Sequence, residues 1–389
     1  MRLTIGWMQL ALALGALQGL LLASVLLRRP AQRTANRLLA ALMLAFSVYL
    51  VGDVYYAAGL VRDFPHLFGI SYPLPWLFGP LVYLYTVAAS DSSRQFRPRD
   101  ALHFAPVMIV VVATLPIYLM SGADKIALLE RLEAGDVPAV LTVLEPWKYV
   151  SGLAYSVLTV RHLLRHRRRV ENSYSNTERV NLSWLLRLAG AAAAIWLLAV
   201  AIGIADLLPQ SIQRPSDDLV GLAIAILVYA IGYMGLRQPE VHRYDGPAPE
   251  PPAGAAPAPR DRGEARYERS GLTDAEAAAL EAELLALMAR EHPYRDPDLT
   301  LADLADRLST TPHKLSEVLN SELAQTFYDF VNSYRVEEVR RRLADAKSKR
   351  QNVLALAMDA GFASKSTFNQ VFKKRTGQTP SSYRKALAG

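Results

Sequence analysis

The first 237 residues contain apolar runs that are too long and too poor in charge for an ordinary water-soluble core. A helix crosses the hydrocarbon layer of a bilayer, which is roughly 30 Å thick, with about 20 predominantly apolar residues. Seven runs have this length, and they predict a bundle of seven transmembrane helices at about 5–27, 38–60, 68–89, 102–120, 141–163, 188–208 and 218–236. The first run is 23 residues long and is followed by Arg28 and Arg29, which favours a retained helix over a cleaved signal peptide.

The positive charges in the loops predict the orientation of this bundle. Lys and Arg concentrate in the first, third and fifth loops, within 28–37, 94–99 and 161–179, and are sparse in the others. Short loops rich in Lys and Arg stay in the cytoplasm. We therefore expect a multi-pass protein of the inner (cytoplasmic) membrane with its N-terminus outside and everything after the seventh span in the cytoplasm.

Composition argues against an enzyme. The chain of 389 residues has no cysteine, so it has no disulfide framework, no thiolate nucleophile and no cysteine-based metal site. It also has no HExxH, GxSxG or phosphate-binding glycine loop, and its spans carry no paired aspartates at their middle. We expect no catalytic residues, no metal and no cofactor.

A change of composition after the seventh span marks a domain boundary. Residues 238–269 include YDGPAPEPPAGAAPAPRDRG, with six prolines and little to bury. Such a segment cannot recover its ordering entropy by packing, so we interpret it as a flexible linker that uncouples the seven-helix domain, 1–237, from a domain at 270–389. A protease-accessible release site is the alternative interpretation.

Two helix-turn-helix units are predicted in this last domain, at about 301–323 and 353–377. In the first, Thr311 is the expected N-cap and Pro312 the first residue of the second helix. In the second, Gly361 is the expected turn and Ser364 the expected cap. The apolar stripes expected to be buried are Leu315, Val318, Leu319 and Leu323 in one unit and Phe368, Val371 and Phe372 in the other.

The opposite faces of these helices carry the residue types that read DNA. They are His313, Ser316, Glu317 and Asn320 in the first unit, and Lys365, Ser366, Thr367, Asn369, Gln370, Lys373 and Lys374 in the second. Asn and Gln can bond adenine edges, Ser and Thr bond several base edges, and Lys neutralises phosphate. From residue 351 onward six positive side chains stand against one negative, which suits a polyanionic partner.

A helix of about 20 residues is expected between the two units. At 1.5 Å per residue it would be about 30 Å long, close to the roughly 34 Å repeat that separates successive major-groove segments. One chain could therefore present two recognition helices to neighbouring grooves of double-stranded DNA.

These segments resemble the DNA-binding domain of the AraC/XylS family of bacterial transcription regulators over about residues 270–388. The most specific matches are Ala357, Gly361, Phe362, Ser364, Ser366, Phe368, Phe372, Lys373, Gly377, Thr379, Pro380, Tyr383 and Arg384. The resemblance implies that the second helix of each unit enters the major groove. Base reading would then fall to His313, Ser316 and Glu317, and to Lys365, Ser366, Thr367 and Gln370. Glu317 departs from the basic character usual there, although it could accept a hydrogen bond from cytosine.

Ionisable residues near the outer ends of the spans are candidates for binding a signal. Asp53 and Tyr56 lie in the second span, and Glu145 and Lys148 flank Trp147 in the fifth. Charges inside spans are costly, so each is a functional hypothesis. The alternative is that the aromatic residues form an interfacial belt and the charges are hydrated or paired with each other.

The whole sequence thus predicts an all-α, membrane-bound regulator of the AraC type whose seven-helix domain senses a signal and controls a cytoplasmic DNA-binding domain. Its predicted partners are double-stranded DNA, the lipid bilayer, an unknown signal ligand, a second copy in a homodimer and, for an activator, RNA polymerase. The alternative is a transporter-like or passive membrane anchor whose DNA-binding domain is released by proteolysis. Inverted repeats and midplane charge clusters, which a transporter would show, are not evident in the sequence.

Overall fold

The computed structural model describes residues 6–30, 32–91, 94–177, 183–205, 218–237, 272–345 and 351–387. Within these ranges every regular element is a helix. The chain divides into two compact units. The N-terminal unit comprises Met1–His166 and Leu182–Pro239, and the C-terminal unit comprises Arg167–Asn181 and Glu240–Gly389. The predicted linker at 238–269 lies outside the described residues.

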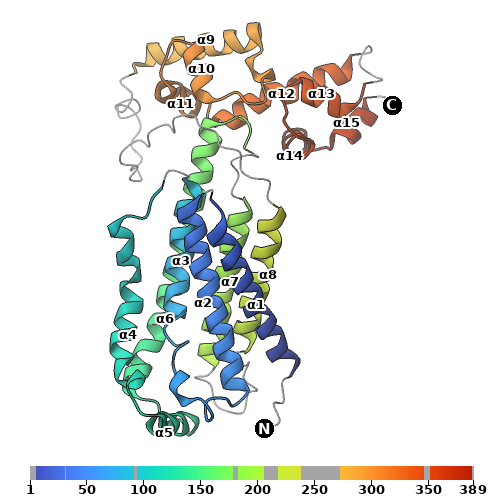
Figure 1. The fold of residues 1–389 in the computed structure, drawn as a ribbon. Coiled ribbons are helices and arrows are strands. Elements are labelled where there is room, and N and C mark those ends of the chain that lie inside the picture. Colours follow the sequence, from blue (N-terminus) through green and yellow to red (C-terminus); the bar gives the residue numbers. More distant parts are fainter. Residues whose placement is uncertain are drawn as a thin grey trace. The chain divides into compact units, whose positions relative to one another are not determined.

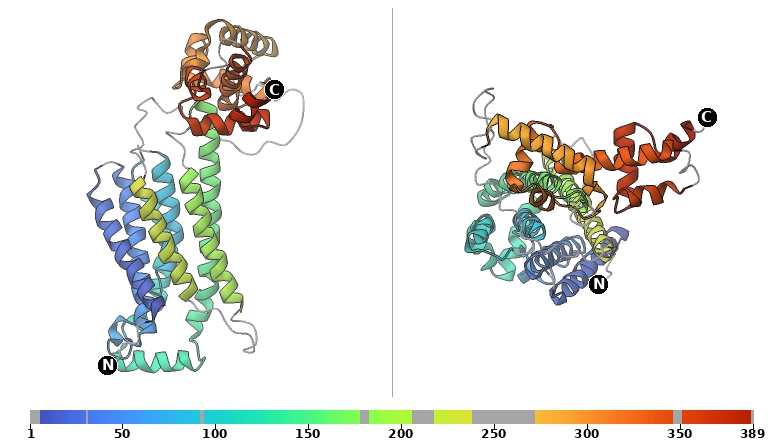
Figure 2. Two further views of the ribbon diagram at one scale, coloured as in Figure 1. Left: turned by 90° about the vertical axis from the view of Figure 1, so that its right-hand side faces the viewer. Right: turned by 90° about the horizontal axis from the view of Figure 1, so that it is seen from above.

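The N-terminal unit is a bundle of long helices (Figures 1 and 2). Its elements are α1 (Trp7–Arg28), α2 (Arg33–Ala57), η1 (Pro65–Leu67), α3 (Pro75–Ser90), η2 (Pro98–Phe104), α4 (Ala105–Tyr118), α5 (Gly122–Glu133), α6 (Ala139–Ser173), α7 (Ser183–Ala205) and α8 (Asp218–Arg237). The short helix α5, which the sequence analysis did not predict, lies across one end of the bundle. Helix α6 is continuous over 35 residues, and its residues from Arg167 onward belong to the C-terminal unit.

Among the residues that the structure describes, four helical stretches are long and apolar enough to cross a membrane: Trp7–Arg28, Arg33–Ala57, Pro98–Tyr118 and Trp184–Ala205. Helix α8 is apolar over the shorter stretch Leu219–Met234. Helix α3 has only 16 residues, whereas the predicted span covered 68–89. The reason is local, because proline favours the first turn of a helix and Pro75 begins α3, after a run of turns.

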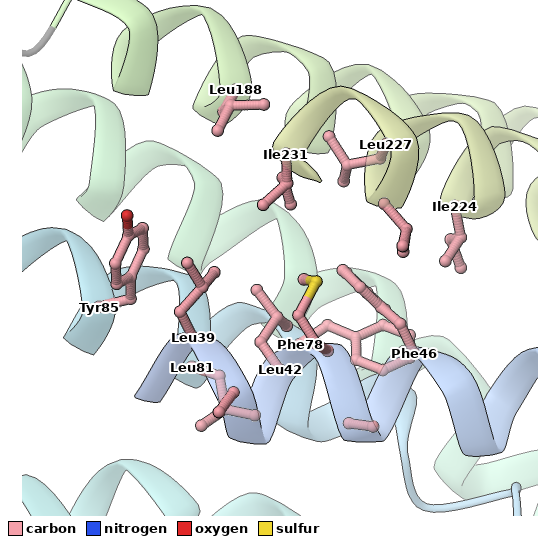
Figure 3. Packing of buried hydrophobic residues seen from close by; sticks show 14 of the residues in the cluster. Leu39, Leu42, Phe46, Phe78, Leu81, Tyr85, Leu188, Ile224, Leu227 and Ile231 are labelled. Carbon is pink, nitrogen blue, oxygen red and sulfur yellow. The ribbon is translucent and has the colours of Figure 1, made fainter. Parts of the chain in front are cut away.

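Buried apolar side chains from several helices form the main core of the N-terminal unit (Figure 3). Phe46 of α2 meets Phe78 of α3 edge to face, with ring centroids 4.6 Å apart, and Ile224 and Leu227 of α8 belong to the same cluster. Small residues allow the helices to approach closely, as is common between helices in membranes. Between α1 and α2, the hydroxyl of Ser47 donates to the carbonyl oxygen of Ala16 at 2.9 Å.

Helices α6 and α7 approach each other closely at Gly152. A Cβ atom there would overlap the indole ring of Trp196, which is 8% exposed. Gly190, also on α7, has nothing within 4 Å of where its Cβ would be. The two glycines therefore form a matched pair for mutation, since only Gly152 lies where a side chain would disturb the contact between helices.

We expect Gly152→Ala to lower the thermal stability of the N-terminal unit, because the added methyl group separates α6 from α7 and overpacking typically costs about 1–3 kcal/mol. Gly190→Ala should leave stability unchanged or raise it, since alanine is more favourable than glycine inside a helix by about 1 kcal/mol. The measurement is the melting temperature of the purified full-length protein in detergent, followed by tryptophan fluorescence, since Trp196 itself reports this contact. Equal melting temperatures for the two variants would contradict this packing.

The C-terminal unit contains eight described helices besides the end of α6. They are α9 (Asp274–Glu291), η3 (Pro293–Arg295), α10 (Leu301–Arg307), α11 (Pro312–Ser321), α12 (Phe327–Ala344), α13 (Val353–Asp359), α14 (Lys365–Thr376) and α15 (Pro380–Ala386). Helix α12 joins two groups of helices, drawn in orange and red in the right-hand view of Figure 2. The first group is α9 to α11, and the second is α13 to α15.

Each group has its own core, and α12 contributes to both. Phe327, Phe330 and Val331 from its first half belong to the core with α9, α10 and α11. Val336, Val339 and Leu343 from its second half belong to the core with α13 and α14. The predicted spacer helix is therefore a shared structural element. It has 18 residues, which corresponds to about 27 Å.

Candidate nucleic-acid interface

Helix α11 presents the first set of predicted DNA-binding residues. The hydroxyl of Thr311 caps the helix by accepting from the backbone N–H of Lys314 at 3.3 Å. Leu315, Val318 and Leu319 are buried, which turns the opposite face outward. On that face His313 and Asn320 are exposed, whereas Ser316 and Glu317 are half-buried.

The side chains of two residues of this set are directed toward their own protein rather than fully toward solvent. The side-chain amide of Asn320 donates to the carbonyl oxygen of Ser316 at 2.7 Å, one turn earlier. One carboxylate oxygen of Glu317, Oε2, is buried and has no hydrogen-bond partner among the described residues. Glu317 is thus directed partly toward the protein, and His313 is the most accessible base-reading candidate on this helix.

Helix α14 presents the second set. The hydroxyl of Ser364 accepts from the backbone N–H of Thr367 at 3.2 Å and begins the helix as predicted. Phe368, Val371 and Phe372 are buried. The outward side chains are mostly exposed: Lys365, Ser366, Asn369, Gln370, Lys373 and Lys374, with Thr367 half-buried.

Lys374 differs from its neighbours because it pairs within the protein. Its Nζ lies 3.1 Å from Oδ1 of Asp329 in the first turn of α12. Arg375 donates to the carbonyl oxygen of Asp329 at 2.7 Å. These two contacts brace α14 against α12, a role that the sequence pattern did not reveal, since both residues looked like free surface charges.

The two groups of helices meet at a junction built around Arg335 of α12. Arg335 is only 1% exposed, and its Nε and Nη2 donate to the carbonyl oxygens of Tyr294 and Asp296, both at 2.7 Å. Its guanidinium also lies 6.0 Å from the ring centre of Phe362, in the second core. Burial lowers the pKa of Arg335 to about 10, which leaves it cationic at neutral pH.

Gly361 allows the two groups of helices to approach closely at this junction. It has φ +95°, a left-handed conformation that favours glycine, and a Cβ atom there would collide with the carbonyl oxygen of Tyr294. The turn of the second helix-turn-helix unit therefore rests directly on the backbone of the first group. The predicted role of Gly361 was the turn alone, and its second role depends on tertiary contact.

A buried carboxylate strengthens the junction. The side chain of Glu338 on α12 is 2% exposed and accepts hydrogen bonds from Arg295 and Arg342, both at 2.8 Å, and from Arg341. Burial alone would raise the pKa of Glu338, but the hydrogen bonds from Arg342 and Arg295 outweigh it. The pKa of Glu338 is thus below its usual value of 4.5.

We expect Glu338→Gln to destabilise the C-terminal unit at pH 7 by about 1–3 kcal/mol, the usual contribution of hydrogen bonds to a charged group. Because the folded-state pKa is lowered, this stabilisation is present above pH 4.5 and is lost as pH falls through the folded-state value. The difference between wild type and variant should therefore shrink at pH 3. Hydrogen exchange of peptides covering α12, corrected for the intrinsic pH effect, would measure it.

Glu337→Gln is the matched control for this prediction. Glu337 is the preceding residue of α12, its side chain is 66% exposed, and it pairs with Arg340 at the surface. Exposed ion pairs contribute about 0–1 kcal/mol, so its removal should have little effect at any pH. A Glu338 variant that behaves like the Glu337 variant would argue against the buried cluster.

The four residues predicted to bind a signal are not brought together as one group. Glu145 and Lys148 of α6 pair with each other. Tyr56 accepts a hydrogen bond from the backbone N–H of Gly69 at 3.1 Å. Asp53 lies against α8, where a Cβ atom on Gly221 would come within 2.6 Å of its Oδ2.

A cavity between the helices of the N-terminal unit offers a different place for a ligand. Of the four predicted residues, only Lys148 lines it. The lining is mainly aromatic and aliphatic and comes from α2, α3, α6, α7 and α8: Phe46, Tyr49, Pro75, Phe78, Gly79, Val82, Lys148, Tyr149, Tyr155, Ser156, Thr159, Ala189, Ala192, Ile195, Trp196, Ala199, Val220, Ile224 and Leu227. A few polar groups in a mostly apolar lining are typical of small-molecule sites.

No group of three or more metal-ligating side chains occurs in the part of the chain that the structure describes.

The C-terminal unit matches a known protein family. A family described as "Helix-turn-helix domain" matches residues 304–386. The HTH-type transcriptional regulator Rv1931c of Mycobacterium tuberculosis is 31% identical over 88 residues, which are 23% of this chain and 33% of that protein. The melibiose operon regulatory protein of Escherichia coli is 29% identical over 90 residues, 23% of this chain and 29% of that protein.

The match thus spans about a third of the length of these curated relatives. A solved structure of a protein of unknown function from Listeria innocua is 25% identical and covers 27% of this chain and 95% of its own, with a TM-score of 0.24.

Proposed function

We propose that this chain, whose C-terminal unit is a helix-turn-helix domain of the AraC type, is a membrane-embedded bacterial regulator that binds specific DNA sequences under the control of a signal. The observation that carries the proposal is the C-terminal unit itself. It holds two capped helices, α11 and α14, each packed against α12 and each with its polar face turned outward.

In this proposal α11 and α14 enter successive major grooves of one duplex. Gln370 and Asn369 would bond adenine edges, and His313 and Ser316 would read the other half-site. Lys365 and Lys373 would neutralise phosphates and set the salt dependence of binding. Lys374 would contribute less, because it is already paired with Asp329.

The surface of the N-terminal unit supports contact with lipid. On α4 the large apolar side chains Met108, Ile109 and Val112 are 58%, 63% and 65% exposed. Water-soluble proteins rarely expose contiguous apolar surface of this kind. We propose an inner-membrane protein in which α1 to α4 and α6 to α8 provide seven spans, with the N-terminus outside and the C-terminal unit in the cytoplasm.

The cavity of the N-terminal unit is the proposed place for the signal, which would be a mostly apolar molecule with a polar group near Lys148. A ligand that binds one arrangement of the helices better than another shifts the population toward it. Asp53, Tyr56 and Glu145 remain candidates for transmitting or tuning this response rather than for lining the cavity.

The proposal predicts discrete DNA sites occupied by the full-length protein in the membrane. Chromatin precipitation with a C-terminal tag, together with blots of membrane and soluble fractions, tests it. Occupied sites with all of the tag in membranes at 42.9 kDa would support a tethered regulator. Sites occupied only when a smaller soluble fragment accumulates would favour proteolytic release, and an absence of sites would contradict DNA regulation.

Two exposed residues of α14 should separate base reading from phosphate binding. Gln370→Ala should weaken binding by about 1–3 kcal/mol at the preferred site and relax the preference at one base position. Lys373→Ala should weaken binding to all sequences alike and reduce the slope of log K against log salt by about 1. Both effects are measured from the binding of each purified protein to a library of DNA sequences at several salt concentrations. If the two substitutions had identical effects, the proposed roles of both residues would be wrong.

A further inference from the structure

A short segment that follows α6 lies inside the C-terminal unit, far in sequence from the rest of that unit. Tyr174 forms an isolated antiparallel bridge with Thr300, the residue that caps α10. The next residue, Ser175, is 1% exposed, and its backbone N–H and its hydroxyl donate to the carbonyl oxygen of Leu299 at 3.3 Å and 2.6 Å. The segment is therefore held by both main-chain and side-chain bonds.

Ser175 also completes the hydrogen bonding of the buried Arg335. Its carbonyl oxygen accepts from Nη1 at 3.3 Å, and its hydroxyl oxygen accepts from Nη2 at 3.1 Å. The remaining N–H groups reach the side-chain oxygen of Asn332 and the carbonyl oxygens of Tyr294 and Asp296. A guanidinium has five N–H donors, and here Ser175 supplies two of the five acceptors.

An empty site at this position would be unfavourable. Without Ser175, two N–H groups of a buried cation would lose their acceptors, and the side-chain amide of Asn332 would lose its bond to the Ser175 carbonyl oxygen at 3.2 Å. Unsatisfied buried groups, charged ones above all, are strongly destabilising. The chemistry of the site, cationic and amide donors beside the backbone carbonyl oxygen of Leu299, fits an extended peptide with a small hydroxyl side chain.

We infer that the junction of the two helix-turn-helix groups is a binding site for residues 174–176 of the same chain, and that docking of this segment holds α11 and α14 in the arrangement that binds DNA. The segment is the direct continuation of α6, which is unbroken from Ala139 to Ser173 and whose residues before Arg167 belong to the N-terminal unit. A movement of α6 can therefore alter the hydrogen bonds between Ser175 and Arg335 without involving the proline-rich linker. This inference rests on the proposed function.

The effect on DNA follows from the position of Arg335. It bonds to Tyr294 and Asp296 of the first group and lies beside Phe362 of the second. Loss of its acceptors loosens the link between the two recognition helices. Two linked binding elements gain affinity only while their geometry allows both to engage, so a looser junction lowers the affinity for DNA.

The absence of cysteine from the chain allows docking to be tested directly. We expect the antiparallel register that pairs Tyr174 with Thr300 to bring Asn176 near Asp298. We expect N176C/D298C, in full-length protein in native membranes with a protease site in the linker, to form a disulfide under mild oxidation. After cleavage, the two fragments should remain linked on a non-reducing gel. N172C/D298C is the control, since residue 172 still lies in α6.

Ser175→Ala tests the consequence for DNA, with Ser173→Ala as the matched control from the end of α6. Affinity is measured for the purified full-length protein in nanodiscs and a DNA fragment recovered from an occupied site. We expect Ser175→Ala to weaken binding about tenfold or more, the effect of a lost hydrogen bond to a charged group, and Ser173→Ala to bind as wild type. Adding the N176C/D298C disulfide to Ser175→Ala should restore affinity, which separates undocking from misfolding.

Fragments that separate as readily as in the control pair would overturn the docking, and wild-type affinity in Ser175→Ala would overturn its role in DNA binding. Failure of the proposed function has a different signature. If the wild-type protein occupies no DNA site, the disulfide experiment still reports whether the segment docks, because it does not depend on DNA.

Discussion

The arrangement of the C-terminal unit depends on the hydrogen bonds made by one buried cation, the guanidinium of Arg335. Removing a charged group from water costs several kcal/mol unless hydrogen bonds replace its hydration. Arg335 obtains these bonds from a serine in the segment after α6, from two carbonyl oxygens near η3 and from an asparagine of α12. Because these acceptors come from segments far apart in the sequence, the guanidinium is fully bonded only when all of them are in place. The junction is therefore well defined, and the two recognition helices are held through it.

In the proposed membrane setting, the helices of the N-terminal unit are held together by other interactions. Between helices in lipid the hydrophobic effect gives little preference for association, so close packing of small residues and a few interhelical hydrogen bonds take its place. Gly152 against Trp196 and Ser47 bonded to Ala16 are contacts of this kind. In our proposal, a small molecule in the cavity shared by five helices favours one arrangement of these helices.

The docked segment changes how the two units are connected. With the linker at 238–269 as the sole connection, the C-terminal unit would be uncoupled from the proposed signal-sensing domain. Residues 167–177 provide a second connection, which is ordered and belongs to the C-terminal unit. A fragment cut free in the linker would leave Ser175 behind on the membrane side. In our proposal, the docked segment therefore belongs to a regulator that acts while attached to its N-terminal unit.

The sequence by itself determined the local features: the apolar runs, the helix caps at Thr311 and Ser364, the buried stripes of α11 and α14, and the resemblance to AraC-type regulators. These follow from periodicity and capping, which involve residues only a few positions apart. Only the tertiary structure decided that Lys374 is paired, that Lys148 lines a cavity between five helices, and that α12 contributes to both cores of the C-terminal unit. It alone also showed that Arg335 is buried, because an arginine on an amphipathic helix looks like a surface charge until its acceptors, more than 100 residues away in the case of Ser175, are brought to it.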